Sequence, residues 1–394
     1  MAGARISAVV LDLDGTLLDT EGDEGDIGEF LAMYGKVPDL EKEEKRLGQM
    51  HKESAAEIVR DYELPLSGRS FRRRSCRCIR KDLILFWNYE KSTHQWPQAK
   101  PLPGVNRLIR HLHKHGIPLG LASNSIRKHI ETKLSHHKDW KESFSVILGG
   151  DDVNHGKPSQ TCWYLSFKFL EAAKRLGVDS SSCLVIEDSV VGVRAAKASG
   201  AKVVAAPSLQ SQVENYSIAN SVLHSLLEFQ PELWAFHHLK IVHFYADSST
   251  FRVQNTLPIE PLLVRDLLCE VVSDAILSVN TENCSCESLP DQLWGVLFGW
   301  AKLEKHGTYK MVASIGWDLS LGIPKRVTRL SLLDPIENFK EELLHLLLVG
   351  YIRKLQNEEN MSEALKISEE DESIARAALD LPVFAHHANN LLFE

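Results

Sequence analysis

Short apolar runs alternate with amphipathic segments along residues 100–207, and this alternation predicts the first part of the fold. The runs "IPLGLASN", "FSVILGGDD", "CLVIED" and "AKVVAAP" have the composition of buried strands. The segments "GVNRLIRHLHKHG", "FLEAAKRLG" and "SVVGVRAAKASG" have apolar residues at helical spacing and end in glycine. Strands that alternate with helices in this way predict an α/β domain, with a parallel sheet covered on both faces.

Another apolar run, "ISAVVLDL", stands near the start of the chain and ends in two acidic residues. Asp12 and Asp14 are separated by one leucine and are followed by Gly-Thr. In an open parallel sheet, ligands bind in the crevice at the carboxyl ends of the strands. We therefore expect Asp12 and Asp14 to lie where the first strand opens into a ligand site.

Later segments carry polar residues at corresponding points. These residues are Ser123, Asn124, Lys157, Glu187 and Asp188. Carboxylates gathered in one crevice repel one another unless a cation lies between them, and oxygen ligands suit Mg²⁺. A hydroxyl group and a lysine can then hold phosphate oxygens. The set predicts phosphoryl transfer through an aspartate.

The four motifs resemble those of the haloacid dehalogenase-like phosphatases, which carry "DLDGT", a Ser-Asn pair, a lysine and a pair of acids in this order. The resemblance implies that Asp12 attacks phosphorus, and that Asp14 protonates the leaving alcohol and then activates water. Ser123 and Lys157 would stabilise the transferring group. The predicted metal ligands are Asp12, Asp14, Glu187 and Asp188, and the residues predicted to contact cofactor are Gly15, Thr16 and Asn124.

Residues 20–98 separate the first motif from the second, and their composition predicts an inserted helical cap. In the family that these motifs resemble, such a cap covers the site and selects the substrate. The cap contains "RSFRRRSCRCIRKD", which could clamp an anionic substrate, bind nucleic acid or form a solvated basic face. We favour the solvated face.

The pattern changes after the last strand of the α/β region. The phosphatase core is predicted at 1–19 and 99–210, and residues 211–258 form the predicted linker. Residues 259–394 contain short β-rich runs at turn spacing, which predict an antiparallel barrel or sandwich. A charged segment, "SEEDESIARAALDLP", follows as a predicted helix.

This second half resembles the riboflavin kinases, through "NTLPIEP", "GVLFGWAKL", "YKMVASIGW" and "LLVGYIR". The order of the two halves is similar to that of the plant proteins that join an FMN phosphatase to a riboflavin kinase. The resemblance implies that the first domain hydrolyses FMN to riboflavin and phosphate. It has gaps at 66–98, 160–168, 235–253 and 262–290, which reflect either divergence or sequence read through splice sites.

The kinase half departs from its family at the motifs that carry chemistry. Riboflavin kinases have a glycine-rich loop for ATP phosphates and a Pro-Thr-Ala-Asn element, but residues 262–284 contain neither. A catalytic glutamate is expected in the strand that reads "KRVTRLSLLD", where Thr328 stands near its place and no acid comes before Asp334. We therefore predict that kinase activity is absent or crippled.

Composition limits the remaining choices. The 394 residues carry a net charge of −8, which gives no sign of a nucleic-acid or membrane partner. Seven cysteines, an odd number, and no apparent leader favour a cytoplasmic protein. The oligomeric state is not indicated. Two alternatives stay open, an intact bifunctional enzyme and a non-catalytic protein that binds flavin or a partner.

Overall fold

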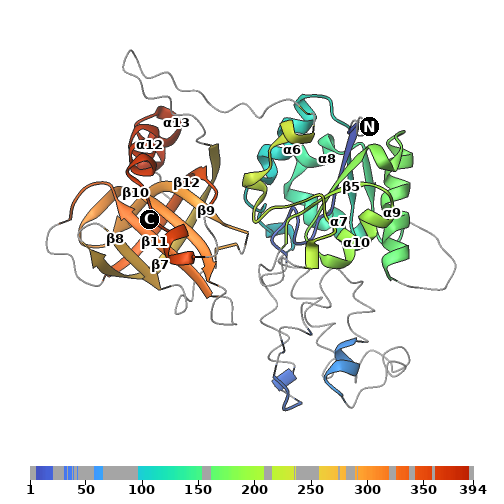
Figure 1. Ribbon diagram of the computed structural model, residues 1–394, viewed down its shortest axis with the longest axis horizontal. Coiled ribbons are helices and arrows are strands. Elements are labelled where there is room, and N and C mark those ends of the chain that lie inside the picture. Colours follow the sequence, from blue (N-terminus) through green and yellow to red (C-terminus); the bar gives the residue numbers. More distant parts are fainter. Residues whose placement is uncertain are drawn as a thin grey trace. The chain divides into compact units, whose positions relative to one another are not determined.

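The computed structural model forms two compact units, Met1–Leu223 with Leu233–His237 and His224–Glu232 with His238–Glu394 (Figure 1). The residues that the structure describes are 6–20, 31–32, 34–37, 39, 42, 57–64, 96–152, 161–207, 215–234, 236, 257–273, 276–280, 289–290, 292–318, 325–336, 342–356 and 360–389. Each unit has its own apolar core, so the two are described separately.

The first unit is built on a six-stranded parallel sheet with the strand order β3-β2-β1-β4-β5-β6. The strands are β1 (Ala8–Leu11), β2 (Leu119–Ala122), β3 (Val146–Leu148), β4 (Cys183–Glu187), β5 (Lys202–Ala205) and β6 (Ser221–Val222). Every residue of β1, β2 and β4 is buried, which explains why these strands read as continuous apolar runs.

Helices connect the strands and cover both faces of this sheet. They are α6 (Val105–Lys114), α7 (Arg127–Lys133), α8 (Lys138–Ser143), α9 (Thr161–Arg175) and α10 (Val190–Ala198). α6 packs with α8, and α9 packs with α10 on the other side of the sheet (Figure 1). The α/β layers predicted from the sequence are confirmed.

The predicted cap, 20–98, lies mostly outside the described residues, and so does its arginine-rich stretch. Its described part includes a small apolar cluster of Leu31, Ile58, Tyr62 and Leu64, all buried. The short helix η2 (Trp96–Gln98) stands at the end of this range. The cap therefore stays a prediction.

The second unit is a closed antiparallel barrel with the strand order β10-β11-β8-β7-β12-β9. The strands are β7 (Leu257–Ser273), β8 (Ile276–Asn280), β9 (Gly295–Leu303), β10 (Gly307–Asp318), β11 (Lys325–Leu332) and β12 (Glu342–Arg353). β10 pairs with β9 and closes the ring. Of the two antiparallel folds predicted from turn spacing, the structure has the barrel.

The predicted charged helix follows the barrel as α12 (Glu369–Leu379). Ser368 and Asp371 form a capping box at its start, which satisfies two backbone amides that the first turn leaves without helical partners. The apolar face of α12 packs on β9, β10 and β12. The short helices α11 (Met361–Ala364), α13 (Pro382–Ala385) and η8 (His386–Asn389) flank it.

Residues 211–258, predicted as a linker, contain regular structure in their described part. β6 pairs with β5 and extends the first sheet. The short helices η6 (Leu226–Glu228) and η7 (Pro231–Trp234) follow. Among the described residues, no helix has the length and apolar character needed to cross a membrane.

Candidate functional site

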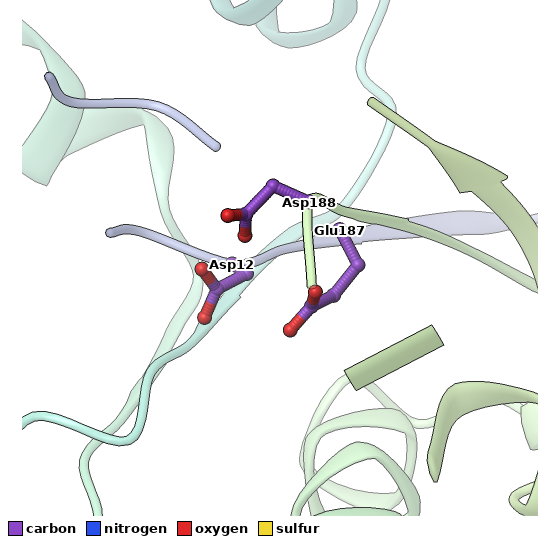
Figure 2. A group of neighbouring side chains, drawn as sticks. All are labelled: Asp12, Glu187 and Asp188. Carbon is purple, nitrogen blue, oxygen red and sulfur yellow. The ribbon is translucent and has the colours of Figure 1, made fainter. Parts of the chain in front are cut away.

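Three carboxylates meet at the carboxyl ends of β1 and β4. Asp12 follows β1 directly, Glu187 is the last residue of β4, and Asp188 comes next. One oxygen of each lies within 4.8 Å of the others, and all three residues are buried (Figure 2). β1 and β4 are paired neighbours in the sheet, so their ends necessarily bring these acids together.

Glu187 is held against the start of α10. Its Oε2 accepts hydrogen bonds from the Ser189 backbone amide at 2.7 Å and the Ser189 hydroxyl at 3.0 Å. Ser189 also caps α10, because its hydroxyl accepts a bond from the Gly192 amide. A Cβ atom at Gly192 would lie only 1.8 Å from Glu187 Oε1, so any side chain at this position would displace the Glu187 carboxylate.

Burial and mutual repulsion perturb the acids of this cluster. Burial raises the pKa of Asp12 well above its usual value, and the charges of Glu187, Asp188 and Asp14 raise it further. Burial, followed by the charge of Asp188, raises the pKa of Glu187 to about 8. Carboxylates that resist ionisation in the absence of a counter-charge are typical of a cation site.

The donor set fits a hard divalent cation. Asp12, Glu187 and Asp188 offer oxygen ligands in one buried place, and no softer nitrogen or sulfur ligand joins them among the described residues. A divalent ion between them would remove the repulsion that raises their pKa values. These three acids were all predicted as metal ligands from the sequence.

The side chain of Asp14, also predicted as a ligand, points to another partner. Its Oδ1 pairs with Lys133 Nζ at 2.5 Å, and Thr20 donates to the same oxygen at 2.9 Å. Ser125 and Ser123 donate to Oδ2 at 2.8 and 3.3 Å. Burial raises the pKa of Asp14, but the charge of Lys133 and these hydrogen bonds outweigh it and lower the pKa to about 2.

The other predicted residues that the structure describes lie around these acids. Ser123 is fully buried at the end of β2, and its hydroxyl contacts Asp14. Thr16 donates to Asp188 Oδ1 at 2.9 Å. Gly15 has a φ of 73°, which suits glycine in the tight turn after Asp14. Asn124 accepts a hydrogen bond from Lys168. Lys157 lies outside the described residues.

Two buried lysines of the site were not found by sequence reasoning. Lys133 ends α7 and is 3% exposed, with its ammonium group 4.4 Å from the centre of the Trp96 ring. Lys168 lies on α9 and is 1% exposed. One sequence signal could have found Lys168, because it lies on the apolar face of its helix. It is next to Phe169 and one turn before Ala172, and both are buried.

Comparison with known proteins gives the family. A model of the haloacid dehalogenase-like hydrolases matches residues 6–200, and a riboflavin kinase model matches residues 274–379. The bifunctional riboflavin kinase/FMN phosphatase of Arabidopsis thaliana is 41% identical over 387 residues, which are 96% of this chain and 94% of that protein. The chain belongs to the family of bifunctional riboflavin kinase/FMN phosphatases. The resemblance predicted from the motifs is confirmed for both halves.

A member of this family has a haloacid dehalogenase-like hydrolase domain followed by a riboflavin kinase domain, and it is an enzyme of the phosphomonoester hydrolase class.

A probable pseudouridine-5'-phosphatase of Drosophila melanogaster is 36% identical over 58% of this chain and 93% of its own length. The solved structure of CbbY from Rhodobacter sphaeroides in complex with phosphate is 26% identical and covers 57% of this chain and 96% of its own, with a TM-score of 0.44.

Proposed function

We propose that the hydrolase domain is a Mg²⁺-dependent phosphatase that works through an aspartyl-phosphate on Asp12. The observation that carries this proposal is the buried cluster at the ends of β1 and β4. In it, a carboxylate oxygen of Asp12 lies within 4.8 Å of an oxygen of Glu187 and one of Asp188. Mg²⁺ held by these carboxylates would withdraw charge from the phosphoryl oxygens and from the Asp12 carboxylate that approaches them.

The reaction takes place in two steps. A carboxylate oxygen of Asp12 attacks phosphorus, the bond between phosphorus and the ester oxygen breaks, and Asp14 gives a proton to the leaving alcohol. Water then attacks the phosphorus of the aspartyl-phosphate while Asp14 takes its proton, and phosphate leaves with Asp12 restored. Ser123, which contacts Asp14, and Lys157 are assigned to the phosphoryl oxygens.

FMN is the proposed substrate of this domain. The 41% identical relative carries FMN phosphatase in its name, and the match covers 96% of this chain. Small-molecule phosphomonoesters such as sugar phosphates are the alternative, because the predicted cap that would select the substrate falls mostly outside the described residues.

The test is phosphate release from FMN in the presence of Mg²⁺, beside the Asp12→Asn variant and a sugar phosphate. We expect release from FMN that Asp12→Asn abolishes, because the amide is not a nucleophile toward phosphorus. Release only from the sugar phosphate would refute FMN and keep the mechanism. A folded protein that releases phosphate from neither ester would favour the non-catalytic alternative, a flavin- or partner-binding protein.

We further propose that the riboflavin kinase domain has lost its kinase activity. Thr328 stands near the place where the resemblance implies a catalytic glutamate. It is 1% exposed and pairs across the sheet with Val279 and Ile315. Within the described residues its hydroxyl has no hydrogen-bond partner. Residues 257–273 form the long strand β7 and contain no glycine that could approach ATP phosphates. FMN formation from riboflavin and ATP would instead support an intact bifunctional enzyme.

The cytoplasm is the proposed location. The seven cysteines favour a reducing compartment, and Cys183 is a free, buried thiol. Cell fractionation with an antibody against the protein tests this, and recovery with an organelle fraction would refute it.

A further inference from the structure

Lys168 is a charged side chain in an apolar setting. It lies on α9, which packs against β1, β2 and β3, and only 1% of the residue is exposed. Its neighbours on the buried face of the helix are Phe169, Ala172 and Ala173. An ammonium group is costly to bury unless nearby groups compensate its charge. The residues that face Lys168 should therefore reveal why it is there.

The ammonium group of Lys168 reaches the phosphatase site. Its Nζ donates a hydrogen bond to Asn124 Oδ1, and Asn124 stands at the end of β2 beside Ser123. Asp12 and Glu187 interact electrostatically with Lys168, and Asp14 does so less strongly. Lys168 is thus directed by Asn124 toward the acids at the strand ends rather than toward solvent.

The charges of the site explain what a lysine would do there. Asp12, Glu187 and Asp188 together carry three negative charges when ionised, and a divalent cation leaves one of them uncompensated. A phosphomonoester dianion would then approach a negative site. Lys133, the other buried lysine among the described residues, is already paired with Asp14. Lys168 can supply the missing positive charge on the Asn124 side of the cluster.

We propose that Lys168 is a catalytic lysine of this site, which contacts the phosphoryl oxygens of the substrate and is held in place by Asn124. This proposal rests on the proposed phosphatase function. It differs from the sequence prediction, which placed the catalytic lysine at Lys157. Lys168 comes from 160–168, one of the segments in which this chain departs from its family, so the motif pattern could not identify it.

The first test compares three variants of the full chain with the wild type by steady-state hydrolysis of FMN and of a sugar phosphate. Lys168→Met should lower kcat/KM by about 100-fold, as expected when one donor to the transferring group is lost. Lys174→Met is the matched control, because this lysine is on the same helix with 81% of its side chain exposed. Lys157→Met measures how much kcat/KM depends on the lysine that the sequence motif predicts. Wild-type kcat/KM in a folded Lys168→Met protein would overturn the proposal, whatever Lys157→Met does.

The second test needs no turnover and uses inorganic phosphate with Mg²⁺ in isothermal titration calorimetry. Lys168→Met should weaken phosphate binding at least tenfold, and Asn124→Ala should weaken it less because the lysine remains. In the double variant, Asn124→Ala should add little, since its effect acts through Lys168. Equal phosphate affinity of wild type and Lys168→Met would overturn the proposal.

The two tests separate this proposal from the phosphatase function itself. If the wild type hydrolyses no ester but its phosphate binding depends on Lys168, the proposed function fails and Lys168 remains the phosphate-binding lysine. If the wild type binds no phosphate, both fail. Should Lys168→Met not fold, Lys168→Gln replaces it, because its amide can still bond to Asn124 without a charge. The thermal unfolding curve of each variant shows which case applies.

Discussion

Lys133 and Asp14 form an ion pair at the edge of the carboxylate cluster, with 2.5 Å between Nζ and Oδ1. Lys133 is the last residue of α7 and its side chain is 3% exposed, while that of Asp14 is 26% exposed. The pair holds Asp14 as a carboxylate, the form that can accept a proton from water. Asp14 can donate a proton to the leaving alcohol only if its contact with Lys133 weakens when the substrate is bound.

Replacement of Lys133 should change the pH dependence of aspartyl-phosphate hydrolysis. In Lys133→Met the carboxylate of Asp14 loses its paired charge, so its pKa rises from about 2 by roughly one unit or more. Because the proposed mechanism needs Asp14 ionised in this step, the acidic limb of the rate profile should move to higher pH. The affected range is about pH 3 to 7. Rapid-quench measurement of the rate at which the phosphorylated enzyme decays over this range would show the shift of the acidic limb. Lys128→Met, an exposed position on α7, is the control, and an unmoved limb would contradict the role of Lys133.

Binding of Mg²⁺ should release a proton near neutral pH. Burial raises the pKa of Glu187 to about 8, so the metal-free protein holds a proton there at pH 7, whereas a metal ligand must be ionised. Below this pKa, the dissociation constant for Mg²⁺ should therefore fall by about tenfold for each unit by which pH is raised. Above this pKa it should level off. Calorimetry in two buffers with different ionisation enthalpies measures the proton. A dissociation constant that does not change with pH would count against the assignment, and Glu187→Gln should reduce the proton release.

Gly192→Ala should disturb the proposed Mg²⁺ site while leaving the domain folded. The added Cβ would lie 1.8 Å from Glu187 Oε1, so the flexible carboxylate must move away from Asp12 and Asp188. Alanine favours the helix by about 1 kcal/mol over glycine, which offsets part of the strain in α10. We expect Mg²⁺ affinity to fall by about tenfold or more, with little change in the unfolding temperature. Ala198→Ser, exposed on the same helix, is the control. Unchanged Mg²⁺ affinity would show that Glu187 is not a ligand.

An ion pair joins the end of β12 to α12, and its contribution to stability should depend on pH. Arg353 and Asp371 are joined by two bonds of 2.8 Å, and Asp371 is 2% exposed. Burial raises the pKa of Asp371, but hydrogen bonds from Arg353 and Ser368 outweigh it, and the folded-state pKa is below the usual value. Its stabilisation is therefore present above the unfolded pKa of about 4 and is lost as pH falls through the folded-state value.

Asp371→Asn should accordingly lower the free energy of unfolding of the kinase domain by about 2 kcal/mol at pH 7, a loss typical of hydrogen bonds to a charged group. Below about pH 4 the loss should be smaller, because the wild-type carboxylate then begins to be protonated. Differential scanning calorimetry at both pH values measures this through the transition of that domain. Asp334→Asn removes the exposed pair with Arg376, so it should change stability by less than about 1 kcal/mol. Equal losses in the two variants would contradict the difference in burial.

Most of the α/β fold could be read from the sequence, because its strands are buried on both faces and appear as unbroken apolar runs. β1 and β4 are examples, with every residue buried. The barrel was harder to specify, since turn spacing does not distinguish a closed sheet from two packed sheets. Closure depends on the pairing of β11 with β8 and of β12 with β7 and β9, which joins residues far apart in the chain.

The sequence alone determined that Asp12, Glu187 and Asp188 meet, because parallel strands in one sheet end at the same edge. It could not determine where Asp14 points or which lysines enter the site. Lys133 and Lys168 are 119 and 156 residues from the acids they face, Asp14 and Asp12, and they approach on helices whose rotation is set by packing against the sheet. Only the tertiary structure decides which face of a helix is buried against a charged site, since a lysine has the same local preferences whether its partner is water or a carboxylate.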